Sequence, residues 1–114
     1  MRKNSEVRVW LHDIVESISL IEGYIAGLSQ EELFNSIEKQ DSVARRLAII
    51  GEAVQHIPED FKNSLPNVAW AKAAGMRNIL VHEYFDVEND LVWKTLNKSL
   101  PEFKKQIEQL IKDV

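Results

Sequence analysis

Apolar residues recur with helical spacing from residue 7 to residue 28. They are separated alternately by four and three residues, which is typical of a helix that packs one seam into a bundle. Asn4 or Ser5 is expected to cap the start of this helix, and Gly27 stands where a residue with left-handed backbone geometry would end it. Gly23 and Gly27 are interpreted as close helix contacts or helix ends. The seam consists of Val7, Leu11, Ile14, Ile18, Ile21, Ile25 and Leu28.

The rest of the chain has the same period. Residues 43–57 carry apolar positions four and three apart, and Pro58 is expected to end that helix, with one or two helical turns after it. A fourth helix is predicted from Trp70 to about Tyr84, and Asp86 is expected to cap a fifth. The last helix should bury Phe103, Ile107, Leu110 and Ile111.

Two segments have the pattern of a capping box. Ser29 and Glu32 predict the start of a short helix, and Ser99 and Glu102, with Pro101 inside the first turn, predict the start of the last helix. No segment alternates with a period of two over the length of a strand. The sequence therefore predicts an all-α up-and-down bundle of four to five main helices.

Composition narrows the class of protein. With 114 residues the chain is expected to form one domain over residues 1–114. The absence of cysteine excludes disulfides, thiolate zinc sites and a cysteine nucleophile. A net charge of −4 argues against a general nucleic-acid coat protein but leaves room for a small basic site. No signal peptide and no apolar run of membrane-spanning length occur, so we expect a soluble, cytoplasmic protein that does not enter a membrane.

The first two histidines each have a carboxylate four residues away. His12 precedes Glu16 and Glu52 precedes His56, so each pair can meet on one helix face. A metal site would need these pairs to converge with further ligands, and the Glu–His spacing of three that marks di-iron bundles is absent from the sequence. We interpret both as ordinary helix-surface pairs, and we expect no metal ion or other cofactor.

The segment from Gly75 to Phe85 combines several groups that could act together. At about 100° per residue, Arg77, Asn78 and His82 share one side of a helix, while apolar residues occupy the opposite arc. The Asn78 amide lies four residues before His82 and can orient its ring, and the planar guanidinium of Arg77 suits phosphate oxygens. On geometry alone, a surface arginine and a partly buried histidine near a helix end is the favoured interpretation, because such pairs arise by chance.

These residues resemble a known motif. Arg77-Asn78-x-x-x-His82-x-Tyr84 is similar to the Arg-x4-His motif of HEPN domains, and the tyrosine resembles that of the HepT-like ribonuclease toxins found in prokaryotic HepT–MntA toxin–antitoxin pairs. The resemblance covers essentially the whole chain. It includes Ile49-Ile50-Gly51-Glu52-Ala53, Trp70 and Val92-Trp93. Ala69 departs from the family, which often has proline before the tryptophan, and this affects the helix entry rather than the chemistry.

The resemblance implies a HEPN-type helical bundle that forms a homodimer and cleaves RNA without a metal ion. Arg77 and His82 would be catalytic, and Asn78 would orient the histidine. The partner would be a small nucleotidyltransferase antitoxin that transfers AMP to Tyr84. The alternative for Tyr84 is a ring that closes the end of its helix, and both roles are compatible. Trp70 and Trp93 are interpreted as core aromatics.

A second class of function is also open. The chain could be a non-catalytic interaction module whose motif face binds nucleotide or docks the nucleotidyltransferase. The acidic net charge favours this alternative, because an acidic ribonuclease would have to bind RNA through a confined basic patch. That patch would lie around Arg77, with Arg45, Arg46 or Lys72 as further candidates. The intact arginine and histidine favour the ribonuclease.

Overall fold

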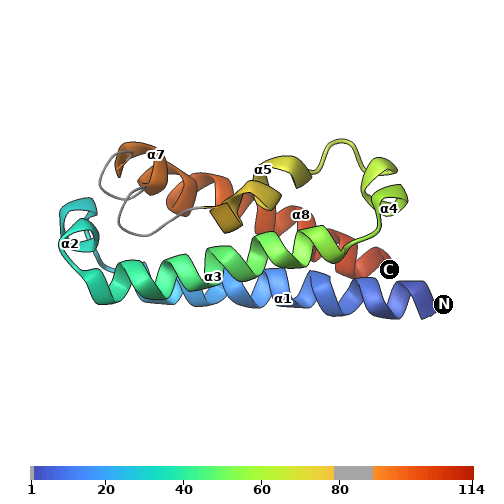
Figure 1. Cartoon of the computed structure of the whole chain (residues 1–114), viewed down its shortest axis with the longest axis horizontal. Coiled ribbons are helices and arrows are strands. Elements are labelled where there is room, and N and C mark those ends of the chain that lie inside the picture. Colours follow the sequence, from blue (N-terminus) through green and yellow to red (C-terminus); the bar gives the residue numbers. More distant parts are fainter. Residues whose placement is uncertain (1, 79–88) are drawn as a thin grey trace.

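The computed structural model describes residues 2–78 and 89–114, and side chains from residue 6 to 76 and from residue 89 onward. All regular secondary structure within these ranges is helical, which confirms the predicted all-α bundle. The helices are drawn in Figure 1. They are α1 (Arg2–Ile25), α2 (Gln30–Phe34), α3 (Ile37–His56), α4 (Glu59–Asn63), α5 (Trp70–Ala74), the 3₁₀ turn η1 (Gly75–Asn78), α7 (Asn89–Lys94), the π turn η2 (Thr95–Ser99) and α8 (Leu100–Asp113).

The two longest helices, α1 and α3, form the base of the bundle. They lie side by side along its long axis and run in opposite directions, with α8 packed against α1 (Figure 1). The predicted seams point into the core: Val7 to Ile25 are buried at every seam position, and Leu28 is half-buried. The α3 seam is also buried throughout, at Val43, Leu47, Ile50, Val54 and Ile57.

The connection from α1 to α2 forms largely as predicted. Gly27 has φ 78°, the left-handed geometry that ends a helix without strain in glycine. Ser29 completes a capping box, because its hydroxyl accepts from the Glu32 amide at 3.1 Å while its own amide donates to Oε1 of Glu32 at 2.9 Å. Gly23 is exposed and has no atom within 4 Å of the position that a Cβ would take, so it is not a close helix contact.

The start of α1 differs from the prediction. Asn4 and Ser5 were expected as caps, but both lie inside a helix that begins at Arg2. A few residues later, Arg8 donates from its guanidinium to the carbonyl oxygen of Val114. On the same two helices, Lys104 Nζ lies 2.7 Å from Oε1 of Glu22. These two contacts join α1 to the C-terminal helix by polar groups as well as through the core.

The second predicted capping box does not form. Ser99 has helical dihedral angles (φ −65°, ψ −44°), and its side chain caps nothing. The chain from Asn89 to Asp113 is instead one continuous helical rod interrupted by the π turn, where the Leu100 amide donates to the Thr95 carbonyl five residues back. Pro101 explains the irregularity, because its ring lacks an N–H and would clash with the carbonyl four residues earlier in a regular helix.

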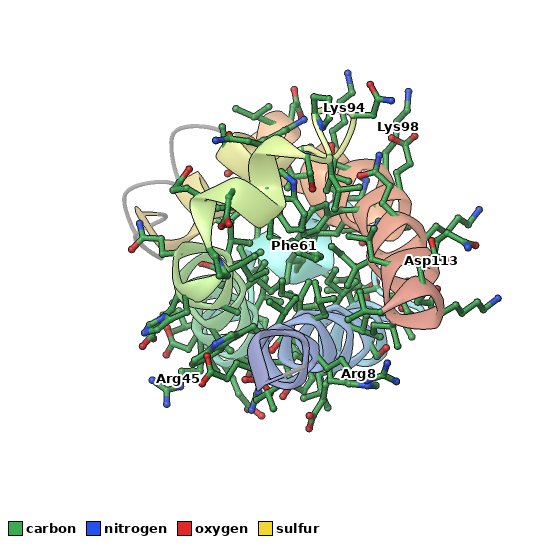
Figure 2. All side chains as sticks on the ribbon, turned by 90° about the vertical axis from the view of Figure 1, so that its right-hand side faces the viewer. Arg8, Arg45, Phe61, Lys94, Lys98 and Asp113 are labelled. Atoms are coloured by element: carbon green, nitrogen blue, oxygen red, sulfur yellow. The ribbon has the colours of Figure 1, made fainter. Side chains whose placement is uncertain are left out.

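The end of the bundle near the chain termini is closed by α4. Pro58 precedes its first turn, as expected, and Phe61 packs against the core although it remains half-buried. Seen along the long axis, Phe61 lies at the centre of the ring of helices (Figure 2). Within the described helices, none is long and apolar enough to cross a membrane.

Candidate functional site

The structure gives the main-chain positions of two of the predicted site residues. Arg77 and Asn78 are the last residues of η1, which follows directly from α5. His82 and Tyr84 lie outside the described residues, as do the side chains of Arg77 and Asn78. The arrangement of these four side chains therefore stays a prediction. The structure shows how the helix and turn that lead to them, α5 and η1, pack against the rest of the bundle.

The predicted helix from Trp70 to Tyr84 changes character at Gly75. The α-helix ends at Ala74, and the next four residues form a 3₁₀ turn, a common ending where glycine lowers helix propensity. A 3₁₀ turn advances about 120° per residue rather than 100°. The helical wheel drawn from the sequence is consequently wrong across Gly75–Asn78, although its prediction that Met76 faces the core is confirmed at 5% exposure.

Two anchored residues hold this segment in place. Trp70 is 8% exposed and makes an edge-to-face contact with Phe103 of α8, with ring centroids 6.1 Å apart. Met76 is buried, and the turn that contains it packs against α3. The backbone of Arg77 therefore begins one residue after a core contact, so its position is set by packing on both sides of Gly75. Trp93 is half-buried and packs against the core, as predicted for both tryptophans.

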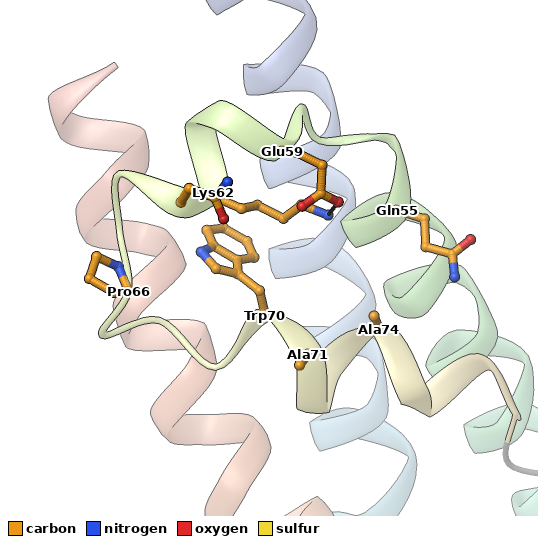
Figure 3. A pocket seen from close by; sticks show the side chains of 8 residues that line it. Gln55, Glu59, Lys62, Pro66, Trp70, Ala71 and Ala74 are labelled. Carbon is orange, nitrogen blue, oxygen red and sulfur yellow. Dashed lines mark ion pairs between the residues drawn. The ribbon is translucent and has the colours of Figure 1, made fainter.

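A groove of about 650 Å³ lies beside α5 (Figure 3). Lys62 carries a cation into it, but that ammonium is already held by Oε1 of Glu59 at 3.2 Å and the Val54 carbonyl at 3.1 Å. The side chain of Lys62 is 11% exposed, against 81% for Glu59. An anion entering here would meet a neutralised charge, so the groove favours neutral polar or aromatic groups. Its lining is Gln55, Glu59, Lys62, Asn63, Pro66, Trp70, Ala71 and Ala74.

A smaller cavity of about 130 Å³ lies between α5 and the π turn. Lys72 and Met76 line it from one side and Ser99 and Glu102 from the other. Lys72 is exposed, and its ammonium donates to the Ser99 hydroxyl at 3.3 Å. Lys72, which the sequence suggested as a further RNA contact, thus stands beside the residue that precedes Arg77.

The other two candidate cations lie on α3. Arg45 is exposed and Arg46 is half-buried. Viewed along the bundle, Arg45 projects from the side opposite Lys94 and Lys98 (Figure 2). The two lysines had not been singled out from the sequence, because nothing in their spacing shows that both stay exposed around a π turn.

The histidine pairs do not both form the expected contacts. His56 contacts the main chain of Glu52, with its Nδ1 2.9 Å from the Glu52 carbonyl oxygen. Its ring stacks on Trp10 with ring centroids 4.4 Å apart. The stack between α1 and α3 had no signal in the sequence. His12 is exposed on α1. Among the described residues, no three side chains of the metal-binding types gather closely enough to hold an ion.

The fold and the motif segment define a class: a small all-α bundle in which an Arg-x4-His segment begins within a 3₁₀ turn that is anchored in the core. A sequence model of the family described as "Ribonuclease HepT-like" matches residues 14–110. The chain belongs to this HepT-like ribonuclease family, as the resemblance predicted.

Curated relatives align over nearly all of the chain. "Probable ribonuclease HepT" of Thermococcus cleftensis is 40% identical over 103 residues, which cover 90% of this chain and 94% of the relative. A "Putative RNase" of Methanocaldococcus jannaschii is 37% identical over 96% of this chain and 90% of the relative.

A longer relative in the same organism, "Gamma-glutamylcyclotransferase and putative RNase", is 37% identical over the whole of this chain, which spans 50% of that protein. No solved structure matches the chain significantly.

Proposed function

We propose that this chain is an endoribonuclease that acts as the toxin of a toxin–antitoxin pair. The observation that carries the proposal is an intact Arg77-x4-His82 motif in a member of the HepT-like ribonuclease family. The relatives' names support RNA as the substrate class. The core-anchored turn that contains Arg77 supports a fixed site, since charge stabilisation needs groups held in place before the reaction begins.

RNA supplies its own nucleophile in the proposed reaction. The 2′-oxygen attacks the neighbouring phosphorus as a base removes its proton, and the bond from phosphorus to the 5′-oxygen breaks as an acid protonates the leaving oxygen. The products are a 2′,3′-cyclic phosphate and a 5′-hydroxyl. An imidazole can serve as base or acid near neutral pH, so His82 takes one of these roles, oriented by Asn78. Arg77 stabilises the charge that develops on the phosphorane.

A homodimer completes this site in the proposal. One chain has one motif histidine, whereas the reaction needs a base and an acid. A twofold axis would bring His82 of both protomers to one groove. Light scattering should therefore give a dimer mass at micromolar concentration, and a monomer would contradict this part. Mixing inactive His82→Ala with inactive Arg77→Ala subunits should recover part of the activity if the site is shared.

The catalytic proposal is tested by RNA cleavage in the presence of EDTA. His82→Ala and Arg77→Ala should each reduce cleavage by at least ~10²-fold, the usual effect of removing a catalytic acid or base or a charge-stabilising group. His12→Ala and Lys112→Ala are matched controls, because both residues are exposed on other helices, and both variants should retain activity. Cleavage that requires Mg²⁺, or that survives both motif substitutions, would refute the mechanism.

The same assay separates the two function classes. A folded chain that never cleaves RNA but binds a nucleotidyltransferase through the motif segment would be the interaction module. Its acidic net charge is the observation that keeps this second candidate open.

Control by a nucleotidyltransferase antitoxin is proposed to act through Tyr84. AMP on the tyrosine oxygen would place a negative phosphate two residues after His82 and weaken binding of the RNA phosphate. Tyr84→Phe should fold and cleave RNA, yet escape neutralisation on co-expression, whereas Tyr24→Phe should be neutralised like the unsubstituted chain. Intact mass shows whether AMP is added. AMP on another residue, or silencing of Tyr84→Phe, would show that Tyr84 is not the switch.

A further inference from the structure

Three exposed lysines lie on α5 and around the π turn of the C-terminal rod. Lys72 belongs to α5 and reaches the Ser99 hydroxyl at 3.3 Å, which places its ammonium beside the turn that ends with Lys98 and Ser99. Lys94 lies four residues before Lys98, about one turn away, and both are exposed. They project from the same side of the molecule in Figure 2. We call Lys72, Lys94 and Lys98 the lysine ridge.

The charges of the ridge are available to a ligand. Within residues 2–78 and 89–114, none of the three ammonium groups lies within 4 Å of a carboxylate oxygen, in contrast to Lys62 and Lys104, which are both paired. Asp90 lies four residues before Lys94, and Glu102 lies four residues after Lys98. Asp90 accepts a hydrogen bond from Gln30 of α2, and Glu102 is exposed and lines the small cavity together with Lys72. Within the described residues, a chain with a net charge of −4 thus has three exposed lysines around the π turn whose ammonium groups form no ion pair.

The ridge borders the segment that carries the proposed catalytic arginine. The small cavity between α5 and the π turn is lined by both Lys72 and Met76, and Met76 immediately precedes Arg77. A strand of polyanion lying along the ridge would therefore continue toward the backbone of η1. The surface on which Arg45 projects faces the other side of the bundle (Figure 2).

We propose that the lysine ridge binds the phosphate backbone of RNA next to the cleaved nucleotide. This inference rests on the proposed ribonuclease function and adds the surface that supplies affinity. Lysine ammonium groups contact phosphates as point charges without reading bases, so the ridge positions a single strand irrespective of its sequence. It also answers the objection raised by the acidic net charge, because only the local field must attract RNA.

The test measures binding of a short, labelled single-stranded RNA by fluorescence anisotropy in the His82→Ala background. Each lost phosphate contact should lower the slope of log K against log salt by about 0.7 for a single strand. Lys94→Gln/Lys98→Gln should therefore lower the slope by about 1.4. If the variant and the parent bind equally at 1 M salt, where the electrostatic contribution vanishes, this slope difference weakens binding of the variant about 25-fold at 0.1 M salt. Lys72→Gln should lower the slope by about 0.7, and Glu102→Gln should strengthen binding.

The matched control is Lys105→Gln/Lys112→Gln, which removes the same total charge from two exposed positions farther along α8. It should leave the slope within a few tenths of the parent. The proposed role of the lysine ridge is refuted if the control loses as much affinity as Lys94→Gln/Lys98→Gln, or if Lys94→Gln/Lys98→Gln keeps the parent slope. In either case the binding of RNA by the parent still stands. If the parent binds no RNA at low salt, the proposed function fails first. Circular dichroism of each variant verifies that the bundle is intact.

Discussion

The helices α1 and α3 are regular over 24 and 20 residues, whereas the described segments that cover them, α5, η1, α7 and η2, are four to six residues long. Helices α1 and α3 have ordinary α geometry and bury every apolar seam position that lies within them. The cover mixes α, 3₁₀ and π turns because Gly75 and Pro101 interrupt a regular helix. The proposed chemistry belongs to the irregular cover, and the regular base supplies the packing that holds it. Stability and activity should accordingly respond to different substitutions.

The largest expected effect on stability is in the base. Ile50→Ala removes a side chain with 0% exposure from the α3 seam and should lower the free energy of unfolding by about 3 kcal/mol, through lost burial and a cavity. The urea midpoint followed by circular dichroism measures this. Ile37→Ala is the control, since Ile37 is 62% exposed and its loss should cost less than about 0.5 kcal/mol. Equal effects of the two would contradict the burial pattern.

Met76 should affect both properties. Met76→Ala is expected to cost about 2 kcal/mol of stability, since Met76 keeps 5% exposure beside a small cavity. It should also slow RNA cleavage by about 10-fold or more under conditions where the variant is folded, because small displacements of catalytic groups are costly. Met76→Leu should cost less than about 1.5 kcal/mol and keep the rate. If folded Met76→Ala cleaves at the full rate while folded Ile50→Ala does not, the division between base and cover is wrong.

The smallest expected effect compares the two serines that share a capping-box pattern. Ser29→Ala should cost about 1 kcal/mol, since it removes a hydroxyl that accepts from the Glu32 amide. Ser99→Ala should cost less than about 0.5 kcal/mol, because Ser99 lies inside a continuous helix and loses only an exposed contact with Lys72. Thermal unfolding of both variants tests this, and a larger loss at Ser99 would mean that the rod is not continuous.

The same two regions divide what could be predicted from sequence. Hydrophobic period predicts most of α1 and the end of α3, because burial of one seam dominates their energetics. The predicted seam of α3 starts at Val43, six residues after the helix begins at Ile37. Prediction from sequence fails at Ser99, where the pattern of a cap is present but the chain before it is already helical, so no free amides await a cap. It also fails beyond Ala74, because a 3₁₀ turn has a different angular step from the one assumed.

For the candidate site, the sequence identified residue types and the family, but not what surrounds them. The buried position of Met76 followed from its place among apolar residues. The lysine ridge did not, because it depends on a contact between Ser99 of the π turn and Lys72, which lies 27 residues earlier in the chain. Such contacts between short segments carry no periodic signal.

The contact between Arg8 and the Val114 carbonyl has a consequence for chain connectivity. Both ends of the described chain emerge at the same end of the bundle (Figure 1). A short glycine–serine linker could therefore join them, and new termini could be opened at the exposed Ala26–Gly27 turn. In such a circular permutant, α1 would follow α8, against which it already packs, as an ordinary helical hairpin. The order in which helices are synthesised would change while the cover, with its proposed site, stayed in one unbroken piece.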